Sequence, residues 1–74
     1  MLSAEDIAAM IRQKLPDARV DVQGDDGRHY AARVESAAFV GLPRVRQHQM
    51  VYAALGDLVG GDALHALQLT TATP

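Results

Sequence analysis

The chain has 74 residues, of which 49% are hydrophobic, a composition that suits one small globular domain rather than a disordered segment. Seven basic residues against nine acidic ones give a net charge of −2, which gives no support to a dedicated duplex-binding protein. There is no cysteine, which excludes disulfides, a cysteine nucleophile and any metal site built from the chain's own thiolates. We therefore predict a single domain over residues 1–74.

The sequence contains no apolar run long enough for a membrane span, and its first six residues are acidic rather than basic. A secretory signal is thus not expected. Together with the missing cysteines, this predicts a cytoplasmic protein.

The first predicted element is a helix over residues 4–14. Ser3 is a favourable N-cap residue, and Asp6 stands three residues later, where a capping-box acid belongs. Pro16 disfavours continuation of the helix. The core-facing residues recur at four-residue spacing: Ile7, Ile11 and Leu15.

Residues 19–23 and 29–35 are predicted to form a β-hairpin. Both segments alternate apolar and polar residues, and the intervening Gly-Asp-Asp-Gly contains the Asp-Gly pair that favours a hairpin turn. His29 falls on the polar face near this turn. The predicted core-facing residues of the hairpin are Val20, Val22, Tyr30, Ala32 and Val34.

Ser36 is predicted to cap one short helical turn that contains Phe39. A long helix then begins near Arg44 and ends at Gly60-Gly61, and residues 64–71 form a last strand. The predicted apolar stripe of the long helix comprises Val45, His48, Val51, Tyr52, Leu55, Leu58 and Val59.

The order of these elements is helix, strand, strand, short helix, helix, strand. It predicts an α+β fold in which a three-stranded mixed sheet carries its helices on one face. Because the last strand follows a helical crossover, it should run parallel to its neighbour.

Five segments, taken in order, resemble the BolA family. They are Gly-Arg-His-Tyr at 27–30, Ser-Ala-Ala-Phe-Val-Gly at 36–41, residues 44–52, His-Ala-Leu at 65–67 and Thr-Pro at 73–74. The acidic, glycine-containing hairpin resembles the IbaG branch. The resemblance implies the α-β-β-α-α-β fold, which is related to a type II KH core.

The resemblance further implies a monothiol glutaredoxin as partner, with a two-iron two-sulfur cluster shared between the two proteins. His65, at the start of the last strand, is the implied ligand, and His29 is a second candidate. Histidine can replace cysteine on one iron of such a cluster, as in Rieske centres, but this chain without thiols would hold no cluster alone. The alternatives are a packed His65 bonded to a backbone carbonyl and an exposed polar His29. His48 is predicted to be structural, bonded through one ring nitrogen.

The second hypothesis is nucleic-acid binding, since BolA-type proteins are also described as transcriptional regulators. KH domains clamp the backbone with a Gly-x-x-Gly loop, and here the second glycine is replaced by Arg44 after Gly41. Arg44 and Arg46 at a helix N-terminus could attract a phosphate or could simply be solvated.

No catalytic constellation is recognisable, so an enzyme is not expected. We expect the glutaredoxin-like partner to dock on the hairpin turn, the Gly41 loop and His65. The edge of the last strand, or a groove beside it, could receive a partner. A weak homodimer is a further candidate assembly, and the sequence assigns no surface to it.

Overall fold

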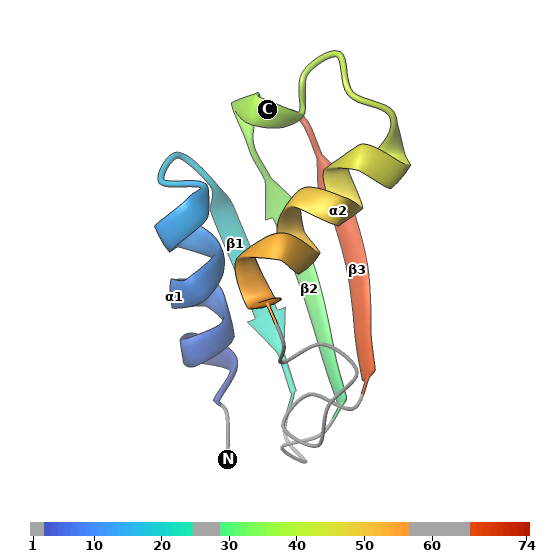
Figure 1. Ribbon diagram of the computed structural model, residues 1–74. Helices are drawn as coiled ribbons and strands as arrows, with labels where there is room; N and C mark the ends of the chain where they lie inside the picture. The colour runs from blue at the N-terminus through green and yellow to red at the C-terminus, as the bar shows by residue number, and fades with distance from the viewer. Residues whose placement is uncertain (1–2, 25–28, 57–65) are drawn as a thin grey trace.

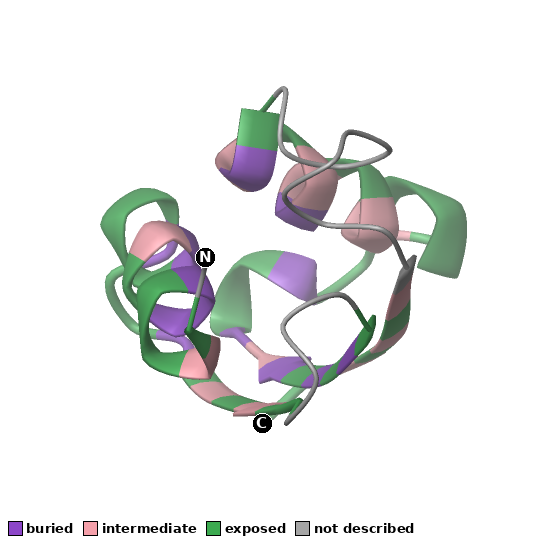
Figure 2. Ribbon diagram, turned by 90° about the horizontal axis from the view of Figure 1, so that it is seen from below, coloured by how far each residue is buried: buried purple, intermediate pink, exposed green. Residues whose placement is uncertain are grey.

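A computed structural model shows a three-stranded sheet with all helices packed on one of its faces (Figures 1 and 2). It describes residues 3–24, 29–56 and 66–74. The elements are α1 (Ala4–Lys14), β1 (Arg19–Gln23), β2 (His29–Glu35), the 3-10 turn η1 (Ala37–Phe39), α2 (Arg44–Leu55) and β3 (Ala66–Ala72).

The strands lie in the order β1-β2-β3, so the central strand is β2. β1 and β2 form an antiparallel hairpin, with Val22 opposite Ala32. β3 returns after α2 and pairs in parallel with β2, with His29 opposite Ala66 and Glu35 opposite Ala72. The predicted α+β class, mixed sheet and one-sided helix layer are therefore confirmed. The predicted short helical turn that contains Phe39 is the 3-10 turn η1.

The start of α1 is fixed by a reciprocal pair of hydrogen bonds. The Asp6 backbone N–H donates to Ser3 Oγ at 3.0 Å, and the Ser3 N–H donates to Asp6 Oδ2 at 3.1 Å. This is the predicted capping box, which satisfies two donors that a helix N-terminus otherwise leaves unpaired. The predicted bounds of the helix are confirmed.

The core lies between the sheet and its helix layer. Tyr30, Ala32 and Val34 are buried along β2, as the alternation predicts, while their neighbours on the strand point to the open face. Among the residues that the structure describes, Phe39 of η1 is the largest fully buried side chain. The other fully buried apolar residues of these ranges are Ile7, Ile11, Val34, Val51 and Leu55.

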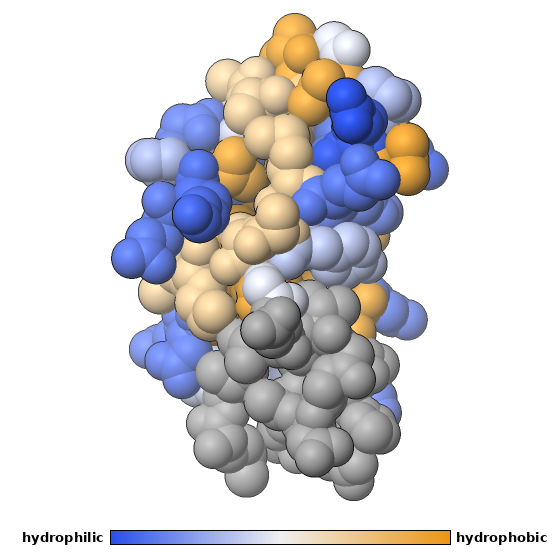
Figure 3. All heavy atoms as spheres, in the orientation of Figure 1, coloured by the Kyte–Doolittle hydropathy of each residue, from blue (hydrophilic) through white to orange (hydrophobic). Residues whose placement is uncertain are grey.

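Two predictions about α2 are wrong. The helix ends at Leu55 rather than at Gly60-Gly61, because Gly56 adopts the left-handed value φ +60. Val45, predicted in the apolar stripe, is 62% exposed. Hydrophobic residues at the surface are visible among hydrophilic ones on the side of the molecule that carries α2 (Figure 3). Leu58 and Val59 lie outside the described residues.

The inward face of α2 includes a polar residue that the hydropathy pattern did not indicate. Gln47 is partly buried and donates through Nε2 to the backbone carbonyls of Phe39 (3.3 Å) and Leu42 (2.9 Å). The glutamine thus satisfies carbonyls of the connection that precedes its own helix, which compensates its desolvation. Within the described ranges, no helix is long and apolar enough to cross a membrane.

Candidate functional site

His29 is the first residue of β2 and its side chain is exposed, on the face opposite to buried Tyr30. In the parallel pairing of β2 with β3 it stands opposite Ala66. Strands in a sheet lie about 4.8 Å apart, so His29 is beside the beginning of β3. His65 is the residue before Ala66 in the sequence but lies outside the described residues, so its predicted ligand role remains a prediction.

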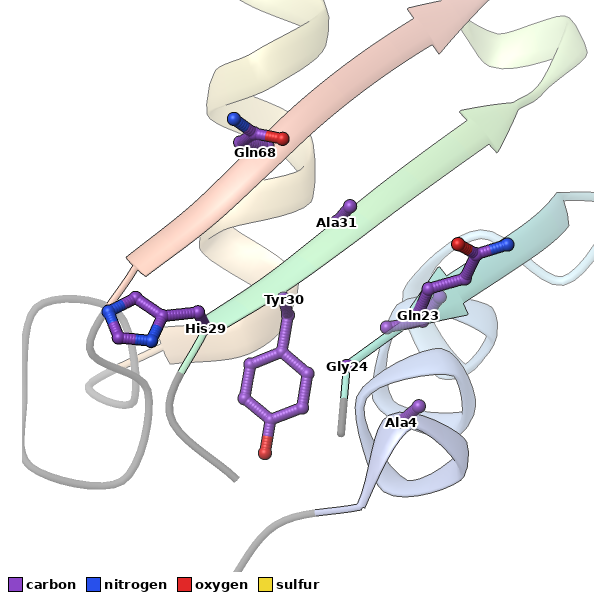
Figure 4. Close-up of a pocket in the computed structure, with 8 residues that line it drawn as sticks. Ala4, Gln23, Gly24, His29, Tyr30, Ala31 and Gln68 are labelled. Carbon is purple, nitrogen blue, oxygen red and sulfur yellow. The ribbon is translucent and has the colours of Figure 1, made fainter. Parts of the chain in front are cut away.

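An open cleft of about 780 Å³ lies at this end of the sheet (Figure 4). It is bounded by the start of α1, the end of β1, the start of β2 and Gln68 of β3. Its described lining residues are Ala4, Val22, Gln23, Gly24, His29, Tyr30, Ala31 and Gln68. We refer to this region as the cleft end of the sheet.

Gly24 shapes the cleft through a close approach. A Cβ at this position would lie 2.5 Å from Cδ1 of Tyr30 and 2.8 Å from the carbonyl oxygen of His29. Such distances are well inside van der Waals contact, so only glycine lets β1 end against the Tyr30 ring. The sequence signal for Gly24 was that of a turn, and this packing role was not predicted.

The described side chains that line the cleft include apolar and polar groups but no carboxylate. The polar ones are the imidazole of His29, the phenol of Tyr30, and the carboxamides of Gln23 and Gln68. Across the described ranges, no three His, Asp or Glu side chains gather closely enough to hold a metal ion. A metal bound at His29 would therefore need ligands beyond these side chains.

The residues of the nucleic-acid hypothesis lie together at the opposite end of β2. Gly41 has φ +81, a conformation that favours glycine, and nothing lies within 4 Å of a Cβ built there. Arg44 and Arg46 are exposed in the first turn of α2, whose N-cap residue Pro43 makes no side-chain capping hydrogen bond. This helix N-terminus therefore has backbone donors without a side-chain acceptor.

Of the surface expected to receive one partner, the hairpin turn and His65 lie outside the described residues, so this expectation stays a prediction. His29 begins β2, whereas Gly41 follows η1, which comes after the other end of that strand. A seven-residue strand is about 20 Å long, so a partner that contacts both regions would have to span about the length of β2.

Near Gly41, side chains from several elements are bonded to one another, and we call this region the anchored end of the sheet. The hydroxyl of fully buried Ser36 donates to Asp17 Oδ1 at 3.0 Å, and the Ala37 N–H donates to Asp17 Oδ2 at 2.9 Å. Thr71 of β3 donates to Oε1 of Gln47 at 2.6 Å. Two hydrogen-bond donors lower the pKa of the Asp17 carboxyl from its ordinary value of 3.8. The Ala37 N–H has the larger effect and the Ser36 hydroxyl the smaller one.

Ser36 also accepts from the Ala38 N–H at 3.1 Å, which confirms its predicted capping role. Its bond to Asp17 spans 19 positions of the chain and was not predicted. The only sequence signal at Asp17 is its place in a turn after Pro16.

His48 packs edge-on against Tyr52, with the ring centroids 6.4 Å apart. Its Nε2 atom is buried and has no hydrogen-bond partner, so this nitrogen does not make the expected hydrogen bond. The ring contact supports the predicted structural role.

A mixed three-stranded sheet with two helices and a 3-10 turn on one face is the fold of several solved BolA structures. One is a bolA protein homologue from Coxiella burnetii, 39% identical, with a TM-score of 0.84 over 100% of this chain and 94% of that one. The chain is also similar to the solved structure of the XC975 protein, which is 58% identical, with a TM-score of 0.67 over 100% of this chain and 91% of that one.

The model of the family described as BolA-like protein matches residues 8–74. The bovine (Bos taurus) BolA-like protein 3 is 32% identical over 72 residues, which are 92% of this chain and 64% of the bovine protein's length. The chain therefore belongs to the BolA-like family. Its predicted place in the IbaG branch remains a prediction.

Proposed function

We propose that this protein is an adaptor that pairs with a monothiol glutaredoxin and contributes imidazole to a two-iron two-sulfur cluster that the two proteins share. The observation that carries the proposal is the position of His29, exposed at the start of β2 and opposite the first residue of β3. His65 directly precedes that residue in the sequence. We thus assign two of the chain's three histidines to one end of the sheet. The structure is the basis for His29, and the sequence is the basis for His65.

The donor set supports a shared cluster rather than a resident one. Iron–sulfur clusters depend on thiolates, and this chain has no cysteine. Histidine can serve as a ligand to one iron, so a cysteine-bearing partner and an imidazole-bearing adaptor complement each other. The cluster is therefore cargo of the complex. The chain's own contribution is to present an imidazole beside an open cleft.

The test is a titration of a cluster-loaded monothiol glutaredoxin with this protein, followed by visible absorption and circular dichroism. We expect the wild-type protein to change the spectrum and the His65→Ala variant to abolish the change. His29→Ala should weaken or abolish it as well. The matched control is His48→Ala, which removes an imidazole from α2, outside the cleft, and should leave the spectral change intact.

An unchanged spectrum with wild-type protein would contradict the proposal. If both His29→Ala and His65→Ala gave the same spectral change as the wild-type protein, neither imidazole would be a cluster ligand, even if the two proteins bind. Calorimetry of the same variants separates these cases, because it measures association independently of the cluster.

A second candidate function is that the anchored end binds the phosphate backbone of a nucleic acid. It is favoured by the uncapped N-terminus of α2 and its exposed Arg44 and Arg46. We expect any such binding to weaken steeply with salt, and to weaken further in the Arg44→Ala/Arg46→Ala variant. Arg19→Ala, at an exposed position of β1, is the matched control. Salt-independent binding would contradict this candidate.

A further inference from the structure

The two edges of the sheet differ in how they are protected. At the β1 edge, the Arg12 guanidinium of α1 donates to the carbonyl oxygen of Val20 at 3.4 Å. β1 also carries the charges of exposed Arg19 and Asp21. Charged side chains and covered backbone groups are the usual protection of an edge strand against pairing with another chain.

The β3 edge has no comparable protection among the described residues. β3 is the end strand of the sheet, and its seven residues, Ala-Leu-Gln-Leu-Thr-Thr-Ala, include no charge, proline or glycine. Leu67 and Leu69 pack against the core but remain only partly buried. An uncharged, regular edge strand with partly buried leucines is suited to accept a further strand.

The direction of the backbone groups along β3 follows from one hydrogen bond. The Ser36 N–H donates to the carbonyl oxygen of Ala72 at 3.1 Å, so the peptide groups of Ala72 point toward β2. Backbone groups alternate sides along a strand, so those of Gln68 and Thr70 also point toward β2. The N–H and C=O groups of Leu67, Leu69 and Thr71 then point outward, away from the sheet.

We propose that the β3 edge pairs with β3 of a second copy of this chain, antiparallel and about a two-fold axis at Leu69. In that register Leu69 faces Leu69 of the second copy, and Leu67 faces its Thr71. All three outward-pointing residues then become hydrogen-bonded pairs, and each pair exchanges two bonds. The two sheets join into one continuous sheet of six strands, and the contact is closed and symmetric.

The side chains favour a second copy as the occupant. On the open face Gln68 stands opposite Thr70 of the second copy, and both side chains are exposed and polar. On the helix face the partly buried Leu69 meets its own counterpart, which adds apolar burial for both chains. Because β3 carries no charge, self-pairing places no like charges opposite each other.

The test is the monomer–dimer equilibrium measured by sedimentation equilibrium from micromolar to millimolar concentration. We expect wild-type protein to dimerise in this range. Thr70→Lys brings two lysines to diagonal positions across the two-fold axis and should raise the dimer dissociation constant about fivefold. Adding Gln68→Glu to that variant should restore dimerisation, because each new lysine then faces a glutamate of the second copy.

The matched control is Gln23→Lys, which adds the same charge to an exposed position of the β1 edge and should leave the equilibrium unchanged. A wild-type chain that stays monomeric at millimolar concentration overturns the proposal. So does a Gln23→Lys effect equal to that of Thr70→Lys, or the failure of Gln68→Glu to restore pairing. His29→Ala should dimerise like wild type, so the outcome is independent of the proposed cluster binding.

Discussion

At the anchored end of the sheet, two side-chain hydrogen bonds connect distant parts of the chain. One joins Ser36, after β2, to Asp17 in the turn before β1, and the other joins Thr71 of β3 to Gln47 of α2. At the cleft end, β1 stops at Gly24 and β2 starts with an exposed histidine beside an open cleft. The difference suggests a division of roles, in which one end stabilises the fold and the other presents side chains to a partner. Substitutions at the two ends should therefore separate stability from binding.

The largest expected effect belongs to Ser36→Ala at the anchored end. The substitution removes a fully buried hydroxyl that donates to Asp17 and caps η1. We expect the free energy of unfolding to fall by about 2–3 kcal/mol, measured by urea denaturation. Ser3→Ala, which removes the exposed cap of α1, should cost only about 1 kcal/mol. Equal losses would contradict the greater stabilisation that we expect from the buried Ser36 hydroxyl.

The next-largest losses of stability are expected from substitution of two glycines, one at each end of the sheet. Gly24→Ala places a methyl group against the Tyr30 ring and should lower stability by about 2 kcal/mol through overpacking. Gly41→Ala meets no neighbour and should lose about 1 kcal/mol through its positive φ alone. NMR shifts of the Tyr30 ring distinguish the two causes, since only Gly24→Ala should move them.

A smaller effect concerns acid stability. Since the folded state lowers the pKa of Asp17, the carboxylate contributes stability above its ordinary value of 3.8 and loses it as the pH falls through the lower folded value. Comparison of urea midpoints from pH 7 to pH 2 should show wild type more stable than Asp17→Asn at neutral pH, with the gap closing in acid. A constant gap would show that Asp17 acts only through its shape.

The smallest effect on stability is expected for His29→Ala at the cleft end. The side chain is exposed, and we expect the free energy of unfolding to change by less than about 0.5 kcal/mol. Thermal unfolding measures this directly. A large loss would mean that His29 holds the fold together, and would weaken its assignment as a residue presented to a partner.

Local signals predicted most of the fold. The capping box of α1, the alternation along β2 and the cap at Ser36 each depend on residues at most three or four positions apart, and all are confirmed. The end of α2 was predicted too late because Gly60-Gly61 outweighed the single Gly56, whose left-handed backbone ends the helix.

The site was harder to predict than the fold. Hydropathy could not show that Gln47 faces inward, since its partners are backbone carbonyls before its helix. The pairing of Asp17 with Ser36 requires the tertiary fold itself. The resemblance singled out His29 and His65, whereas the cleft beside His29 and the role of Gly24 appear only in the three-dimensional arrangement.

The parallel pairing of β2 with β3 also has a consequence for the order of folding. Residues of β1 pair with partners 8 to 16 positions away, whereas His29 pairs with Ala66, 37 positions later. Closing the longer loop has the larger entropic penalty and requires α2 to cross the sheet first. We therefore expect the hairpin to form early and β3 to join last. During synthesis of the chain, Leu67 and Leu69 of β3 are then the last of these core-packing side chains to be buried.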